Sequence, residues 1–74
     1  MEYAILATLW NGPAGIPELV GAVYDRTGRP ADPGLVASYL RLFERFGFVE
    51  RTGDTEPYTL AERGSLYLAY VAAA

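Results

Sequence analysis

A helix with a defined start and stop, followed directly by a strand, is the feature that most limits the folds open to this 74-residue chain. It starts at Asp32, whose side chain can accept hydrogen bonds from the free N–H groups of a first helical turn. Pro33 suits the first helical position, and Gly47 suits the left-handed position just past the last turn. Because the start and stop signals agree, we predict a helix over 33–46.

This helix has two different faces. Projection at 100° per residue places one broad apolar arc on it, made of Leu35, Val36, Tyr39, Leu40, Leu42, Phe43 and Phe46. The opposite face is small at its N-terminal end and cationic towards its C-terminal end, with Gly34, Ser38, Arg41 and Arg45, and with Ala37 and Glu44 at the margin. We predict that Val36, Leu40 and Phe43 lie in the core. Leu35 and Leu42, at the edge of the arc, either pack under a neighbouring helix or remain exposed.

The remaining chain predicts three further helices and a hairpin. The helices are expected over 2–10, 17–27 and 61–73, with a link at 14–16 that can lend one small strand, and the strands over 48–51 and 58–60 flank a polar turn at 52–57. The second and third helices are joined by a link so short that they must cross at a large angle. We therefore predict one domain over 1–74, mainly α with a small β-hairpin (α+β), in the order of a winged helix-turn-helix.

The residue types argue against an enzyme. The chain has no His, Cys or Lys, so the usual general base, thiolate and Schiff-base amine are missing, and Ser38 and Ser65 have no imidazole to activate them. Asp54 and Glu56 form a carboxylate pair, but a polar loop tip offers no burial to shift a pKa. We expect no catalytic residue, no metal and no cofactor.

No segment predicts export or membrane insertion. The N-terminal apolar run is preceded by Glu2 and by no cation, which is wrong for a secretory signal. The longest apolar run, 66–74, is about half the length that a membrane-spanning helix needs. We expect a cytoplasmic, nucleoid-associated protein without a membrane partner.

Basic charge is concentrated around the third helix. The segment from Arg26 to Arg51 holds five arginines against three carboxylates, a net charge of +2, whereas the rest of the chain carries −5 and the whole chain −3. A polyanion is bound through such cations. A segment picked out because of its charge will usually differ in charge from the rest of a chain. The alternative is therefore that these arginines are solvated and bind no polyanion.

In a winged helix-turn-helix the third helix enters the major groove of double-stranded DNA while flanking residues hold phosphates. On this reading we predict base contacts from Gly34, Ala37, Ser38 and Arg41, with Arg41 the candidate for a bidentate contact to guanine. Phosphate contacts are predicted for Arg26, Arg29, Arg45 and Arg51. For each arginine the alternative is a solvated side chain or a helical partner of Glu44.

The aromatic content points to an interface between copies. Six Tyr and one Trp are many for so small a core, and aromatic side chains are enriched at interfaces. We predict a homodimer built from the first and last helices through Tyr3, Trp10, Leu66, Tyr67, Tyr70 and Val71. The alternative is that Tyr67 and Tyr70 close the core. A second functional class stays open, in which the third helix and its edge leucines bind a protein partner or antagonise another DNA-binding protein.

Four stretches resemble a known family. They are A-I-L-A-T-L-W-N-G-P-A-G at 4–15, P-E-L at 17–19, the run from Asp32 to Glu50, and Y-T-L-A-E-R-G at 58–64. The chain resembles the winged-helix regulators of the PadR type over most of its length and, more loosely, the MarR type and small archaeal and phage repressors. The resemblance implies a dimeric DNA-binding transcriptional regulator, with the wing beside the recognition helix.

The chain departs from the PadR pattern at three places. Gly15 is followed by Ile16 where the pattern has Tyr, and Ala61 replaces the Thr that caps the last helix, which removes a cap of about 1 kcal/mol. Asp54 and Glu56 make the wing tip acidic, so phosphate repulsion opposes its insertion into a minor groove.

Overall fold

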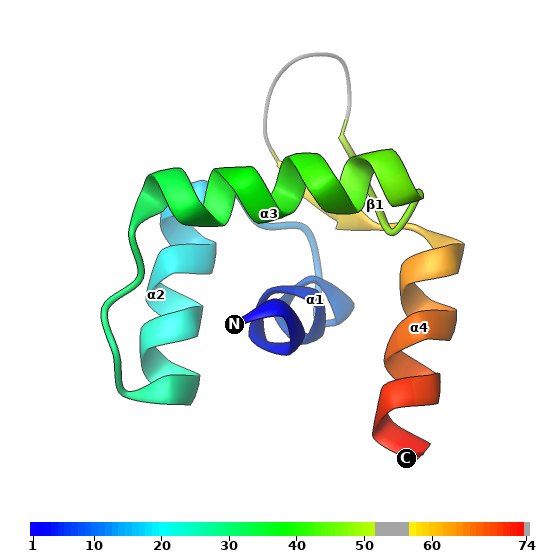
Figure 1. Cartoon of the computed structure of the whole chain (residues 1–74), viewed down its shortest axis with the longest axis horizontal. Helices are drawn as coiled ribbons and strands as arrows, with labels where there is room; N and C mark the ends of the chain where they lie inside the picture. The colour runs from blue at the N-terminus through cyan, green and yellow to red at the C-terminus, as the bar shows by residue number, and fades with distance from the viewer. Residues whose placement is uncertain (52–56, 74) are drawn as a thin grey trace.

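The computed structural model describes residues 1–51 and 57–73, and this part of the chain is mainly helical (Figure 1). The helices are α1 (Glu2–Trp10), α2 (Ile16–Thr27), α3 (Pro33–Phe46) and α4 (Glu62–Ala73), and the strands are β1 (Val49–Arg51) and β2 (Tyr58–Leu60). The two strands pair antiparallel. The α+β content and the order of elements are therefore as predicted. The polar turn predicted over 52–57, with the acidic tip, lies outside the described residues apart from Pro57.

The third helix has the predicted bounds, but its start differs in detail. Gly47 adopts the left-handed conformation with φ 78° and ends the helix as expected. The predicted side-chain cap from Asp32 is not formed. Instead the backbone carbonyl of Asp32 accepts hydrogen bonds from the N–H groups of Leu35 and Val36, both at 3.0 Å. The N–H groups of Leu35 and Val36 are thus bonded to the carbonyl of Asp32 and not to its carboxylate.

The core is assembled around α1, which Figure 1 shows end on between α2 and α4 with α3 lying across them. The largest fully buried side chains of the core come from α1, α2, α3 and β1, and they are Ile5, Leu6, Leu19, Val23, Val36, Leu40 and Val49. The predicted core positions of α3, Val36, Leu40 and Phe43, are all buried, and Leu35 and Leu42 are exposed. The apolar arc of α3 is thus only partly covered by the rest of the chain.

The hairpin is joined to the link between α1 and α2. Cross-strand partners are Val49 with Leu60 and Arg51 with Tyr58. Tyr58 also pairs with Ala14, through N–H to carbonyl hydrogen bonds of 2.9 and 3.1 Å in the two directions. The link predicted to lend a small strand therefore contributes a single antiparallel bridge, which ties β2 to the start of α2.

The last helix packs on the hairpin through its smallest residue. The buried positions of α4 are Gly64 and Leu68, whereas its bulky positions Leu66, Tyr67, Tyr70 and Val71 are exposed. A Cβ on Gly64 would lie 2.7 Å from Cδ1 of Leu60 and 3.0 Å from the carbonyl carbon of Phe48. The α4 backbone therefore approaches the start of the hairpin so closely that only glycine fits. Within the described residues no helix is long and apolar enough to cross a membrane.

Candidate nucleic-acid interface

The outer face of α3 carries a short chain of polar contacts. Ser38 donates from Oγ to the carbonyl of Gly34 at 3.0 Å, and Arg41 donates from Nη2 to Ser38 Oγ at 3.3 Å. All three residues are exposed. The hydroxyl proton is directed at the helix backbone, so its oxygen is free to orient the guanidinium. Three of the residues predicted to touch bases are therefore linked on one surface, and Ala37 lies half-buried beside them.

Arg45 continues this surface by one turn. It is exposed in the last turn of α3, where a cation interacts favourably with the helix dipole. Glu44, the predicted alternative partner for the helix arginines, forms an ion pair with Arg51 of β1. The structure thus places Arg41 and Arg45 together on the exposed face, with the neighbouring carboxylate directed to the hairpin.

Arg51 lies at the junction of α3, β1 and β2. Its Nε is 3.3 Å from Glu44 Oε2, and its Nη1 donates to the hydroxyl of Tyr58 at 3.3 Å. The guanidinium carbon lies 5.5 Å from the centre of the Tyr58 ring, within the range of a cation–π contact. A phosphate contact was predicted for Arg51, and its partners Glu44 and Tyr58 were not. Each partner is seven residues away in the sequence, one on a helix and one on a second strand, and only the fold brings them to Arg51.

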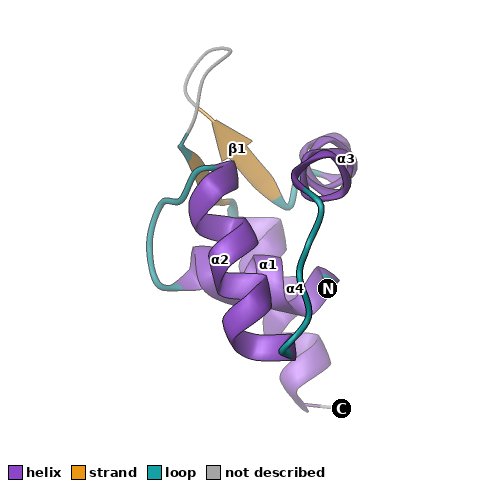
Figure 2. Cartoon of the chain, turned by 90° about the vertical axis from the view of Figure 1, so that its left-hand side faces the viewer, coloured by secondary structure: helices purple, strands orange, loops and turns teal. Residues whose placement is uncertain are grey.

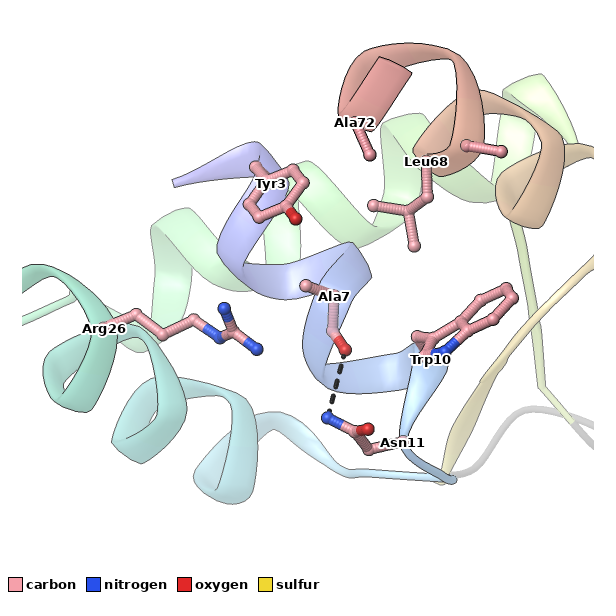
Figure 3. A pocket seen from close by; sticks show the side chains of 8 residues that line it. Tyr3, Ala7, Trp10, Asn11, Arg26, Leu68 and Ala72 are labelled. Carbon is pink, nitrogen blue, oxygen red and sulfur yellow. Dashed lines mark hydrogen bonds between the residues drawn. The ribbon is translucent and has the colours of Figure 1, made fainter.

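The structure does not bring Arg26 and Arg29 to the outer face of α3. The helix α2 runs away from α3, and the link from 28 to 32 climbs back along it to reach Pro33 (Figure 1). Arg26, in the last turn of α2, points toward α1 and lines a groove there (Figure 3). Arg29 follows the end of α2, where its N–H donates to Thr27 Oγ1 at 3.2 Å. Arg26 and Arg29 are close to α3 in the sequence but not in space, because the extended link from 28 to 32 separates the end of α2 from the start of α3.

Arg63 is a residue that sequence reasoning left among the acidic remainder. It donates from Nη1 to the carbonyl of Phe46 at 3.3 Å, so a cation of α4 satisfies a free carbonyl at the end of α3. The sequence offered little indication of this contact beyond the position of Arg63 shortly after β2. The contact fixes α4 to the helix whose outer face is the candidate site.

The six residues predicted for a dimer interface lie on three different surfaces. Tyr3 and Trp10 of α1 line a groove of about 370 Å³ together with Leu68, Ala69 and Ala72 of α4. Figure 3 shows the side chains of Tyr3 and Trp10 on one side of this groove and those of Leu68 and Ala72 on the other. Tyr67 stacks on Phe48 with ring centres 4.9 Å apart, so it packs on the turn after α3 and not on α1. Leu66 and Tyr70 are 65% and 75% exposed on the outer side of α4, and Val71 is exposed beside Tyr67.

A second exposed apolar surface runs along the edge of α3. Leu35, Leu42 and Phe46 are between 41% and 49% exposed, and their spacing of seven and four residues puts them on one stripe. Phe46 continues the stripe to Phe48, at 5.7 Å between ring centres. Of the two outcomes open for the edge leucines, the structure shows exposure: no described residue buries Leu35 or Leu42.

Comparisons with protein-family models, with curated proteins and with solved structures found no match to this chain. The described residues also contain no group of three or more Asp or Glu side chains arranged to hold a metal ion. The assignment of the candidate site therefore rests on the geometry of the outer face of α3 alone.

Proposed function

We propose that this chain is a winged helix that binds double-stranded DNA as a cytoplasmic, nucleoid-associated transcriptional repressor. The observation that carries the proposal is the outer face of α3, where Ser38, Arg41 and Arg45 are exposed on successive turns and Ser38 orients Arg41. Figure 2 shows the β1–β2 hairpin standing beside α3, the arrangement in which a wing flanks a recognition helix.

The exposed face of α3 fits the major groove in size and chemistry. Gly34 has no side chain and Ala37 a single methyl group, so the helix can approach the bases closely at its N-terminal half. Arg41 presents a planar pair of donors that matches O6 and N7 of guanine. Arg45, one turn further on, is suited to a phosphate beside the groove. The net charge of −3 on the whole chain makes these two cations decisive for affinity.

Dimerisation is part of the proposal because one protomer offers few cations. The exposed aromatic side chains of α1 and α4 include Trp10 and Tyr70, which are 63% and 75% exposed. A homodimer joined through them would present two copies of α3 and would read an inverted repeat. A single domain of 74 residues also gains stability from such an interface.

The test is a fluorescence-anisotropy titration with a labelled random duplex at low salt, repeated as the salt concentration rises. Binding at micromolar protein that weakens steeply with salt is expected, and no binding at low salt would refute the proposal. Arg41→Ala and Arg45→Ala are each expected to weaken binding by about fivefold to tenfold. The matched control is Arg29→Ala, which removes the same charge at the far end of α2 and is expected to change binding by less than about twofold.

A protein partner is the second candidate function, and the stripe of Leu35, Leu42 and Phe46 favours it. An apolar stripe on a helix edge suits a partner helix, and the acidic charge of the chain is no handicap for such binding. Leu35→Ser with Leu42→Ser separates the two functions. If the double variant no longer captures a protein partner but binds DNA with unchanged affinity, the second function is supported. If it keeps both the protein partner and the DNA affinity, the second function is excluded.

A further inference from the structure

The contacts of Arg51 connect the two parts of the proposed DNA-binding surface. Glu44 belongs to α3 and Tyr58 to β2, and Arg51 of β1 reaches both, at 3.3 Å in each case. Tyr58 is only 4% exposed, and its backbone is bonded in both directions to Ala14. The guanidinium therefore links α3 to a strand that the rest of the domain already holds in place.

We propose that Arg51 and Glu44 are positioning residues that set the angle of the β1–β2 hairpin to α3, and that they act on DNA binding through this geometry. The inference rests on the proposed function, and it replaces the phosphate contact first predicted for Arg51. The planar guanidinium of Arg51 suits this positioning role. Its N–H donors reach the Glu44 carboxylate and the Tyr58 hydroxyl at once, while its guanidinium carbon lies over the Tyr58 ring.

Removal of Glu44 gives the sharpest test, because the phosphate role and the positioning role of Arg51 predict opposite changes in DNA affinity. If Arg51 served only as a cation for phosphate, Glu44→Ala would strengthen binding, since it removes a negative charge beside the DNA. If the pair sets the hairpin angle, Glu44→Ala weakens binding by about threefold to fivefold, the effect of a partly exposed ion pair. The matched control is Glu50→Ala on β1, which removes an equal charge from an exposed position beside Arg51 in sequence.

The salt dependence and a conservative variant add independent readouts. A residue that neutralises a phosphate contributes about 0.9 to the slope of log affinity against log salt. Arg51→Ala is therefore expected to weaken binding while leaving this slope unchanged. Arg51→Lys keeps the charge but loses the fork, so it is expected to behave like Arg51→Ala. The double variant Glu44→Ala with Arg51→Ala is expected to be no weaker than Arg51→Ala alone.

A readout without DNA keeps the inference separate from the proposed function. Amide hydrogen exchange of β1 and β2 is expected to be faster by a similar factor in Glu44→Ala and Arg51→Ala, and unchanged in Glu50→Ala. If the wild-type protein fails to bind DNA, the proposed function is refuted, and the positioning role is then decided by exchange. Unchanged exchange in both variants, tighter DNA binding by Glu44→Ala, or a reduced salt slope in Arg51→Ala would overturn the inference.

Discussion

Gly64→Ala is expected to destabilise the domain strongly, because the added Cβ has no room. It would meet Cδ1 of Leu60 at 2.7 Å and the carbonyl carbon of Phe48 at 3.0 Å, and the carbonyl oxygen of Phe48 more closely still. That oxygen accepts the N–H of Ala61 at 2.9 Å, and the N–H of Phe48 donates to Phe43 at 2.8 Å. The backbone of Phe48 is thus held by hydrogen bonds at its N–H and at its carbonyl, and the carbonyl cannot turn away from the added Cβ without loss of its bond to Ala61.

The magnitude follows from three contributions. Overpacking costs about 1 to 3 kcal/mol, and a lost or bent backbone hydrogen bond adds about 1 kcal/mol. The higher helix propensity of Ala returns at most about 1 kcal/mol. We expect the free energy of unfolding to fall by about 1 to 3 kcal/mol, and each 1 kcal/mol lowers the Tm of a domain of this size by roughly 4 to 8 °C.

Gly21→Ala is the matched control, since Gly21 lies within α2 with no atom within 4 Å of an added Cβ. The same substitution there is expected to raise the free energy of unfolding by about 0.5 to 1 kcal/mol. Urea unfolding followed by circular dichroism measures both variants. A Gly64→Ala domain as stable as the wild type, or a destabilised Gly21→Ala domain, would show that the packing of α4 on the hairpin is described wrongly.

Three further predictions concern the core, the end of α3 and the α1–α4 surface. Leu40→Ala, at a fully buried position of α3, is expected to cost about 2 to 5 kcal/mol in urea unfolding, and a cost below about 1 kcal/mol would contradict its burial. Gly47→Ala forces a side chain into the left-handed conformation and is expected to lower stability by about 1 kcal/mol, with Gly47→Asn less costly by the same measurement. Trp10→Ala with Tyr70→Ser is expected to shift the mass seen by light scattering from about 16 to about 8 kDa, and a wild-type protein that is monomeric at high concentration would refute the dimer.

The elements of this fold could be predicted from sequence because their signals are local. Gly47 ends α3, and the spacing of Val36, Leu40 and Phe43 marks the buried face, so neither required knowledge of a distant residue. Asp32 shows the limit of local reasoning even here. Its side chain has the right chemistry for a cap, but the backbone carbonyl of the same residue satisfies the N–H of Leu35.

The candidate site was less predictable, because it depends on where distant segments meet. Ser38 and Arg41 are three residues apart on one helix, so their contact follows from helical spacing. Arg51 was assigned to phosphate because its partners Glu44 and Tyr58 are brought to it only by the packing of the hairpin on α3. Arg26 was placed near α3 from its position in the chain, but the direction of α2 carries it to a groove beside α1.

If the chain binds DNA as proposed, the positions of the arginines set how strongly one protomer binds. Arg51 and Arg63 make contacts within the chain, and Arg26 and Arg29 lie toward the other end of α2. Arg41 and Arg45 are therefore the cations that the described part of the chain offers on the outer face of α3. Of these two, Arg45 is the proposed phosphate contact, which gives a salt slope of roughly −0.9 for one protomer and roughly −1.8 for a dimer on an inverted repeat. A measured slope of roughly −1.8 requires the second protomer, so the salt titration tests the dimer and the DNA-binding face in a single experiment.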